Sequence, residues 1–126
     1  MRIALFVALG GAIGAVARHF ASGGMTKLFG RSFPFGTLTV NVVGSFLIGI
    51  VLVALPSGAS PQWRAAIAVG FLGALTTFST FALETVDRIE QGQIGVAIIN
   101  VLANVAVCLV AVWGGLSIAR WLTSDG

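Results

Sequence analysis

Charged residues divide this chain into four long apolar stretches. Uncharged runs cover residues 3–17, 32–63, 65–83 and 91–119. Each can hold a helix approaching the ~20 residues that cross a ~30 Å hydrocarbon core. We therefore predict an all-α integral membrane protein of a single four-helix domain over residues 1–126, whose membrane spans cover about 3–22, 35–55, 64–86 and 94–121.

The composition agrees with a protein built almost entirely inside lipid. Hydrophobic residues make up 57% of the chain and charged residues only 9%, whereas soluble domains carry about a quarter charged residues. The predicted connectors, near 23–34, 56–62 and 87–93, are rich in Gly, Ser, Pro and charge, as turns require. We expect a multi-pass protein of the bacterial inner (plasma) membrane.

The first span has a second interpretation. Arg2, an apolar run and Ala15-Val16-Ala17 resemble a cleaved signal peptide. The Gly10-x-x-x-Gly14 spacing instead favours close packing of membrane helices, and the segments that follow are themselves apolar. We therefore favour a retained span.

The basic residues do not select one orientation in the membrane. With four spans, one side carries Arg2, Arg64 and Arg120, and the other carries Lys27, Arg31, Arg88 and, if it reaches the surface, Arg18. The positive-inside rule then leaves two alternatives: a weak bias decides, or both orientations insert and an antiparallel dimer forms. Abundant small residues on four thin helices favour an obligate homodimer. Because the basic residues flank spans and do not cluster, we expect no nucleic-acid partner.

Two spans carry polar stripes on one helix face. The spacing i, i+4, i+8 recurs in the second and fourth spans, as Thr37, Asn41 and Ser45 and as Asn100, Asn104 and Cys108. An amide without a hydrogen bond is costly in hydrocarbon. The stripes either join helices by hydrogen bonds or line a polar pathway, and the pattern alone leaves both open.

The third span predicts an interrupted helix. Four hydroxyl side chains lie among two Phe rings just after Gly73: Thr76, Thr77, Phe78, Ser79, Thr80 and Phe81. Such side chains compete for backbone hydrogen bonds, so we predict a break near the middle of the membrane. Broken membrane helices offer carbonyls to Na⁺ and donors to anions. The alternative is a continuous helix with back-bonded hydroxyls.

The two Phe rings and Arg18 each have a plain and a functional interpretation. Phe78 and Phe81, at i and i+3, either pack together or present positive ring edges to an anion. Arg18 either extends to the lipid headgroups or raises the anion concentration in a vestibule.

Several function classes are disfavoured. The acidic residues lie at span ends or in connectors, as Glu84, Asp87, Glu90 and Asp125, which disfavours proton-coupled exchange through buried acids. We predict a Glu84–Arg88 pair at i, i+4. No motif for a catalytic nucleophile, a metal cluster or a phosphate-binding loop is present, so we expect no enzyme.

Two segments carry a specific resemblance. Gly-Thr-Leu-Thr-Val-Asn (36–41) and Gly-Phe-Leu-Gly-Ala-Leu-Thr-Thr-Phe-Ser-Thr-Phe (70–81), with Glu-Thr-Val-Asp (84–87), closely resemble the Fluc/CrcB family of fluoride channels. The resemblance covers essentially the whole chain. It implies a dual-topology antiparallel homodimer with two fluoride pathways and a central structural Na⁺.

The resemblance also implies residue roles. The backbone carbonyls of Gly73 and Thr76 would bind Na⁺, and Arg18 would lie in the aqueous vestibule. The fluoride pathway would contain an amide donor, two ring edges and a hydroxyl track, contributed by Asn41, Phe78, Phe81, Ser79 and Thr80. Family members often carry Ser or Thr in the fourth span, where this chain has Asn100, Asn104 and Cys108, so the resemblance assigns these three no role.

The implied function fits elementary ion chemistry. Fluoride is small and strongly hydrated, so it needs a series of good donors to replace its water, while a fixed buried cation would hold it too tightly. Two other functions compete. A small multidrug exporter would require a buried acid in its first span, and a packing subunit would use the polar groups only to join helices.

Overall fold

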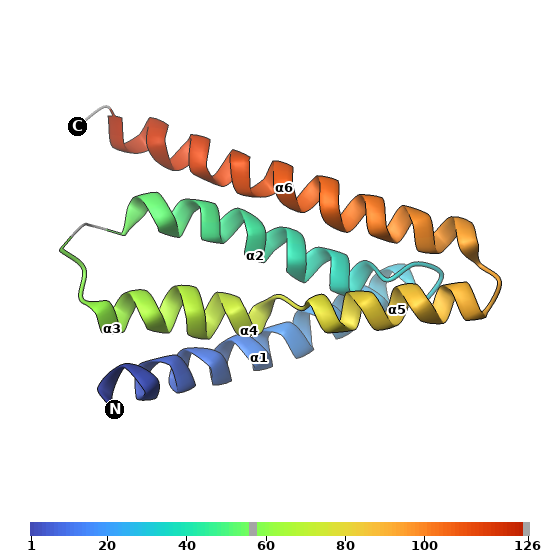
Figure 1. The fold of residues 1–126 in the computed structure, drawn as a ribbon, viewed down its shortest axis with the longest axis horizontal. Helices are drawn as coiled ribbons and strands as arrows, with labels where there is room; N and C mark the ends of the chain where they lie inside the picture. Colours follow the sequence, from blue (N-terminus) through green and yellow to red (C-terminus); the bar gives the residue numbers. More distant parts are fainter. Residues whose placement is uncertain (56–57, 125–126) are drawn as a thin grey trace.

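The computed structural model describes residues 1–55 and 58–124, and over these ranges the chain folds into helices joined by short connectors. Asp125 therefore lies outside the described residues. Four helical rods run side by side in Figure 1, and both Met1 and the end of α6 lie at the same end of the bundle.

The elements follow the predicted spans closely. They are α1 (Arg2–Phe29), α2 (Phe35–Ala54), α3 (Pro61–Arg64), η1 (Ala65–Leu72), α4 (Gly73–Leu75), α5 (Phe78–Glu90) and α6 (Ile94–Ser124). The π-helical η1 links α3 and α4 into one rod, and α5 continues that rod after a break. Among the described residues, four helices are long and apolar enough to cross a membrane: α1, α2, Pro61–Glu90 and α6. The predicted all-α fold with four spans is confirmed.

The first helix is longer than predicted. We placed its end near residue 22, but α1 continues through Gly23 and Gly24 to Phe29. A helical Gly costs only about 1 kcal/mol relative to Ala, so two glycines weaken the helix without ending it. It ends where Gly30 adopts φ 80°, a left-handed conformation that glycine accepts without steric cost.

Glycines bring the rods close together, in several places at the end of the bundle that contains Met1. A Cβ on Gly10 or Gly14 would overlap carbonyl oxygens of Ala66 and Phe71, and a Cβ on Gly115 would overlap that of Phe46. These contacts join α1 to η1 and α6 to α2. Without a hydrophobic force between helices in lipid, such close approach supplies much of their association.

The third rod is interrupted at Thr76 and Thr77. Thr76 has φ −85° and ψ 159°, and Thr77 has φ −152° and ψ 119°, so both are extended. Figure 1 shows this stretch as a thin connection between α4 and α5, near the middle of the rod. The predicted break is confirmed at these two residues.

Candidate functional site

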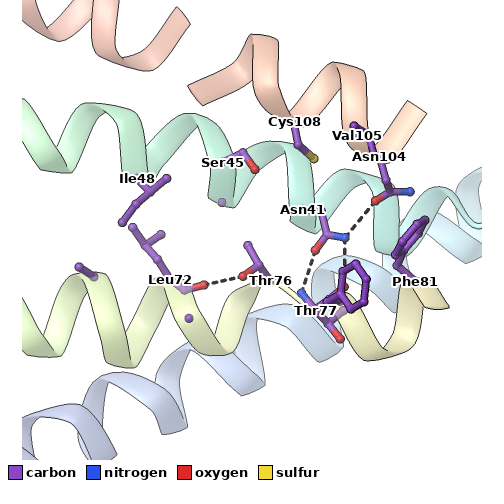
Figure 2. A pocket seen from close by; sticks show the side chains of 14 residues that line it. Asn41, Ser45, Ile48, Leu72, Thr76, Thr77, Phe81, Asn104, Val105 and Cys108 are labelled. Atoms are coloured by element: carbon purple, nitrogen blue, oxygen red, sulfur yellow. Dashed lines mark hydrogen bonds between the residues drawn. The ribbon is translucent and has the colours of Figure 1, made fainter. Parts of the chain in front are cut away.

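Asn41 closes the broken segment with a pair of hydrogen bonds to one residue. Its Nδ2 donates to the Thr77 carbonyl oxygen at 3.1 Å, and its Oδ1 accepts from the Thr77 N–H at 2.8 Å. The Thr77 N–H would otherwise donate to Gly73 one turn back. The side chain of α2 thus replaces the missing helical bond, and Figure 2 shows Asn41 reaching across to Thr77.

The hydroxyl of Thr77 begins the second half of the rod. Its Oγ1 accepts from the Thr80 N–H at 3.2 Å and contacts the Thr80 and Ser79 hydroxyls at 3.0 and 3.3 Å. This is an N-cap, which satisfies one of the four unpaired N–H groups of a helix start. The hydroxyls of Ser79 and Thr80, the two members of the predicted hydroxyl track, therefore both contact the Thr77 hydroxyl. Both residues remain exposed.

A partly open cavity of about 410 Å³ lies between α2, α6 and the third rod. Its lining contains most of the residues that the sequence singled out: Asn41, Ser45, Gly73, Thr76, Thr77, Phe78, Phe81, Asn104 and Cys108. Figure 2 shows Ser45 and Cys108 on neighbouring helices above Thr76. Two members of each polar stripe, Asn41 and Ser45 on α2 and Asn104 and Cys108 on α6, thus face one hollow at the break.

The two Phe rings lie together beside the break but differ in exposure. Their centroids are 5.4 Å apart with the planes inclined at 60°. Phe81 is buried at 8% exposure, whereas Phe78 is 78% exposed. Phe81 is therefore fixed by the fold of one chain, and Phe78 projects from it.

Arg18 turns inward and not toward the ends of α1. Its Nη1 donates to the Thr76 carbonyl oxygen at 3.2 Å, 58 residues away along the chain. The same side chain lines a second cavity of about 640 Å³ with His19, Lys27 and Arg31. This basic cavity reaches Thr77 and Thr80, so it adjoins the break.

The fourth helix contributes a chain of buried amides. Asn41 Nδ2 also donates to Asn104 Oδ1 at 3.0 Å. Asn104 Nδ2 donates to the Asn100 side-chain and backbone oxygens at 2.9 and 3.1 Å, and Asn100 is fully buried. The alternatives of helix joining and cavity lining are therefore combined in Asn41 and Asn104, while Asn100 serves only the first.

Glu84 has a different partner from the one predicted. Its Oε1 accepts from the Thr37 hydroxyl at 2.9 Å, and its Oε2 is buried without a hydrogen-bond partner among the described residues. Arg88 donates instead to Gln93 Oε1 and the Arg31 carbonyl. No hydrogen-bonded Glu84–Arg88 contact forms among the described residues, because Arg88 reaches connector residues brought close by the fold. Arg88 still lies near enough to attract the Glu84 carboxylate electrostatically, so the predicted pair is confirmed only as a proximity of opposite charges. No local pattern predicts the Thr37–Glu84 contact, which joins residues 47 positions apart.

Comparison with known proteins identifies the family. Residues 5–116 match the model described as CrcB-like protein, Camphor Resistance (CrcB). Among curated relatives, the fluoride-specific ion channel FluC of Citrifermentans bemidjiense is 48% identical over 120 residues, covering 94% of this chain and 97% of that one. The protein of the same name from Geobacter sulfurreducens is 48% identical over 124 residues, covering 97% and 100%. That from Shewanella denitrificans is 55% identical over 112 residues, covering 88% and 90%. With this match and its four apolar spans, the chain is a multi-pass protein of the cell membrane and belongs to the CrcB-like family.

Proposed function

We propose that this protein is a fluoride-selective ion channel and not an enzyme. The observation that carries the proposal is the interrupted third rod, whose extended residue Thr77 is held by two hydrogen bonds to Asn41. The cavity beside the break is lined in part by hydroxyl, amide and aromatic groups. Three relatives that align with nearly the whole chain bear the name of a fluoride-specific ion channel.

The break supplies the kind of donors that a small anion needs. The N-terminus of α5 directs N–H groups and the positive end of its helix dipole toward the break. The hydroxyls of Ser79 and Thr80 and the Asn41 amide lie at the same place. We assign the fluoride pathway to these groups and to the edges of Phe78 and Phe81, since ring edges attract anions weakly and exclude water.

Arg18 and its basic neighbours form the entrance in this proposal. The cavity they line ends at Thr77 and Thr80. Positive charge at its walls concentrates anions before they meet uncharged donors. Because the guanidinium donates to the Thr76 carbonyl, its charge is held at a fixed place beside the pathway.

The working form that we propose is an antiparallel homodimer of dual topology. The cavity at the break is partly open and has Asn41, Thr77 and Asn104 in its lining, and polar groups at membrane depth are tolerated only where protein or water covers them. The exposed Phe78 projects beside it. A second copy would cover both, and the balanced basic residues at the two ends of the bundle allow either orientation.

We propose a structural Na⁺ at the centre of that dimer. The Thr77 N–H donates to Asn41, which leaves the Gly73 carbonyl without its usual helical donor. Gly73 also lines the open cavity, so its oxygen suits a hard cation. Thr76 fits less simply: its carbonyl accepts from Arg18 and retains one lone pair for a metal. Two copies would supply four such oxygens.

Passive conduction is sufficient for the proposed physiological role. In acid surroundings fluoride is protonated to HF, which diffuses into the cell. HF dissociates there at the higher internal pH and leaves an anion that crosses lipid poorly. The membrane potential then drives the anion outward with about 2.3 kcal/mol per charge per 100 mV. Relief of fluoride toxicity follows from an open path alone.

The test is halide efflux from liposomes that contain the purified protein. Fluoride efflux without a proton gradient, and little chloride efflux, is the expected result. Proton-coupled export of organic cations without fluoride movement would instead identify an exporter. The absence of any flux would identify a packing subunit and overturn the proposal.

A further inference from the structure

A directed chain of hydrogen bonds leads from the break into the fourth rod. The Thr77 N–H donates to Asn41 Oδ1, Asn41 Nδ2 to Asn104 Oδ1, Asn104 Nδ2 to Asn100 Oδ1, and Asn100 Nδ2 to the Thr85 hydroxyl. The four donor–acceptor distances lie between 2.8 and 3.0 Å. Every amide donates in the same direction along the chain.

This order fixes how the Asn41 amide points. A primary amide has two N–H donors, and those of Asn41 are directed at the Thr77 carbonyl and at Asn104 Oδ1. Reversing the amide would set its NH₂ group against the Thr77 N–H. An anion beside the break can therefore obtain an N–H from Asn41 only by displacing one of these two acceptors.

Of the two acceptors, Asn104 Oδ1 is the one that an ion can displace more easily. The Thr77 carbonyl belongs to the two-bond pair that holds the break, so its loss would disturb the backbone. Asn104 is a side chain that lines the cavity, and its Nδ2 remains held by two oxygens of Asn100 when its own oxygen is released.

We infer that Asn104 is a specificity-determining residue, whose amide oxygen competes with the permeating halide for an N–H of Asn41. The inference rests on the proposed channel function. It assigns selectivity in part to an acceptor inside the protein, which an ion must replace in order to pass.

The competition favours fluoride on electrostatic grounds. Hydrogen bonds to an ion are roughly twice as strong as those between neutral groups, so a halide that approaches closely displaces an amide oxygen. Attraction falls with distance, and chloride, the larger ion, keeps its charge farther from the N–H. Fluoride therefore replaces the Asn104 oxygen at the Asn41 N–H, whereas chloride binds too weakly to replace it and passes less readily.

The experiment compares halide efflux from liposomes for three variants. Asn104→Leu and the smaller Asn104→Ala both remove the competing oxygen, and chloride permeability relative to fluoride should rise about tenfold, the equivalent of one hydrogen bond. Asn100→Leu is the matched control: it also replaces a buried amide, but the Asn100 backbone oxygen still holds Asn104. Its halide ratio should stay at the wild-type value.

A wild-type measurement makes the inference independent of how the variants fold. Side-chain amide NMR signals of Asn41 and Asn104 should both shift when fluoride is added and remain in place with equal chloride. Three results would each overturn the inference: NMR signals that do not shift although the protein conducts fluoride, a wild-type halide ratio in folded Asn104 variants, or an equal rise in chloride permeability in Asn100→Leu. A wild-type protein that conducts no fluoride would instead overturn the proposed function.

Discussion

The two ends of the bundle are held together by different means. At the end that contains Met1, helices touch through glycines, and the contacts at Gly14 and Gly115 are backbone against backbone. Around the break and beyond it, Gly44 and Gly36 also approach neighbouring rods closely. There, however, helices are joined in addition by directed hydrogen bonds through Asn41, Asn104 and Asn100. The first end depends on shape, and the second on the orientation of amides.

The difference separates stability from conduction. Close packing of small residues leaves no polar group facing a cavity, so it can hold the bundle but cannot receive an ion. The amide end combines both tasks, since Asn41 and Asn104 join helices and also line the hollow. Substitutions at the glycine end should therefore change folding, and those at Asn41 and Asn104 should change flux first.

The largest effect is expected for Asn41→Asp. A carboxylate has no N–H for the Thr77 carbonyl or for Asn104 Oδ1, and it places an unpaired charge at membrane depth. An uncompensated buried charge costs about 3–5 kcal/mol, so fluoride flux should fall more than about a hundredfold. Gln93→Glu is the control, because that exposed amide oxygen already accepts from Arg88. Wild-type flux in Asn41→Asp would refute its place in the pathway.

A smaller effect, on stability alone, is expected for Gly115→Ala. The added Cβ would overlap the Phe46 carbonyl, whereas a Cβ on the adjacent Gly114 would meet nothing within 4 Å. Overpacking costs about 1–3 kcal/mol. Denaturant unfolding in micelles should show this loss for Gly115→Ala and none for Gly114→Ala. Equal stability of the two variants would contradict the role given to glycine packing.

The smallest effect is expected for Phe78→Ile. The ring is 78% exposed in one chain, so its loss should leave the folding of that chain unchanged. Aromatic contacts are worth about 0.5–1.5 kcal/mol, so fluoride flux should fall about two- to tenfold while the proposed dimer persists. Phe20→Ile, a similarly exposed ring on α1 at 71%, should conduct normally. Matching flux in the two variants would remove Phe78 from the pathway.

Sequence patterns predicted the parts of this fold that depend on local chemistry. Apolar length located the four spans, and hydroxyls after Gly73 located the break. We underestimated the length of α1 because the pair Gly23-Gly24 is also typical of a turn, and the sequence alone does not show that the residues on both sides of it are helical. The stripes placed Asn41 and Asn104 each on a polar helix face, and the structure adds that these two faces meet at one cavity.

Partners remote in the chain were beyond sequence reasoning. Nothing local indicates that Asn41 binds the backbone of Thr77, that Thr37 binds Glu84, or that Arg18 reaches Thr76. Each contact depends on how the rods are rotated about their axes, which is set by packing over their whole length. The residue types indicate that each group requires a hydrogen-bond partner, but they do not indicate which residue provides it.

The inward Arg18 has a consequence for biosynthesis. Its acceptor, the Thr76 carbonyl, is synthesised 58 residues later, so the first helix leaves the ribosome with a guanidinium that has no ligand in the nascent chain. The Arg18–Thr76 hydrogen bond can therefore form only after the third rod has been synthesised, and until then the guanidinium must find water or lipid headgroups.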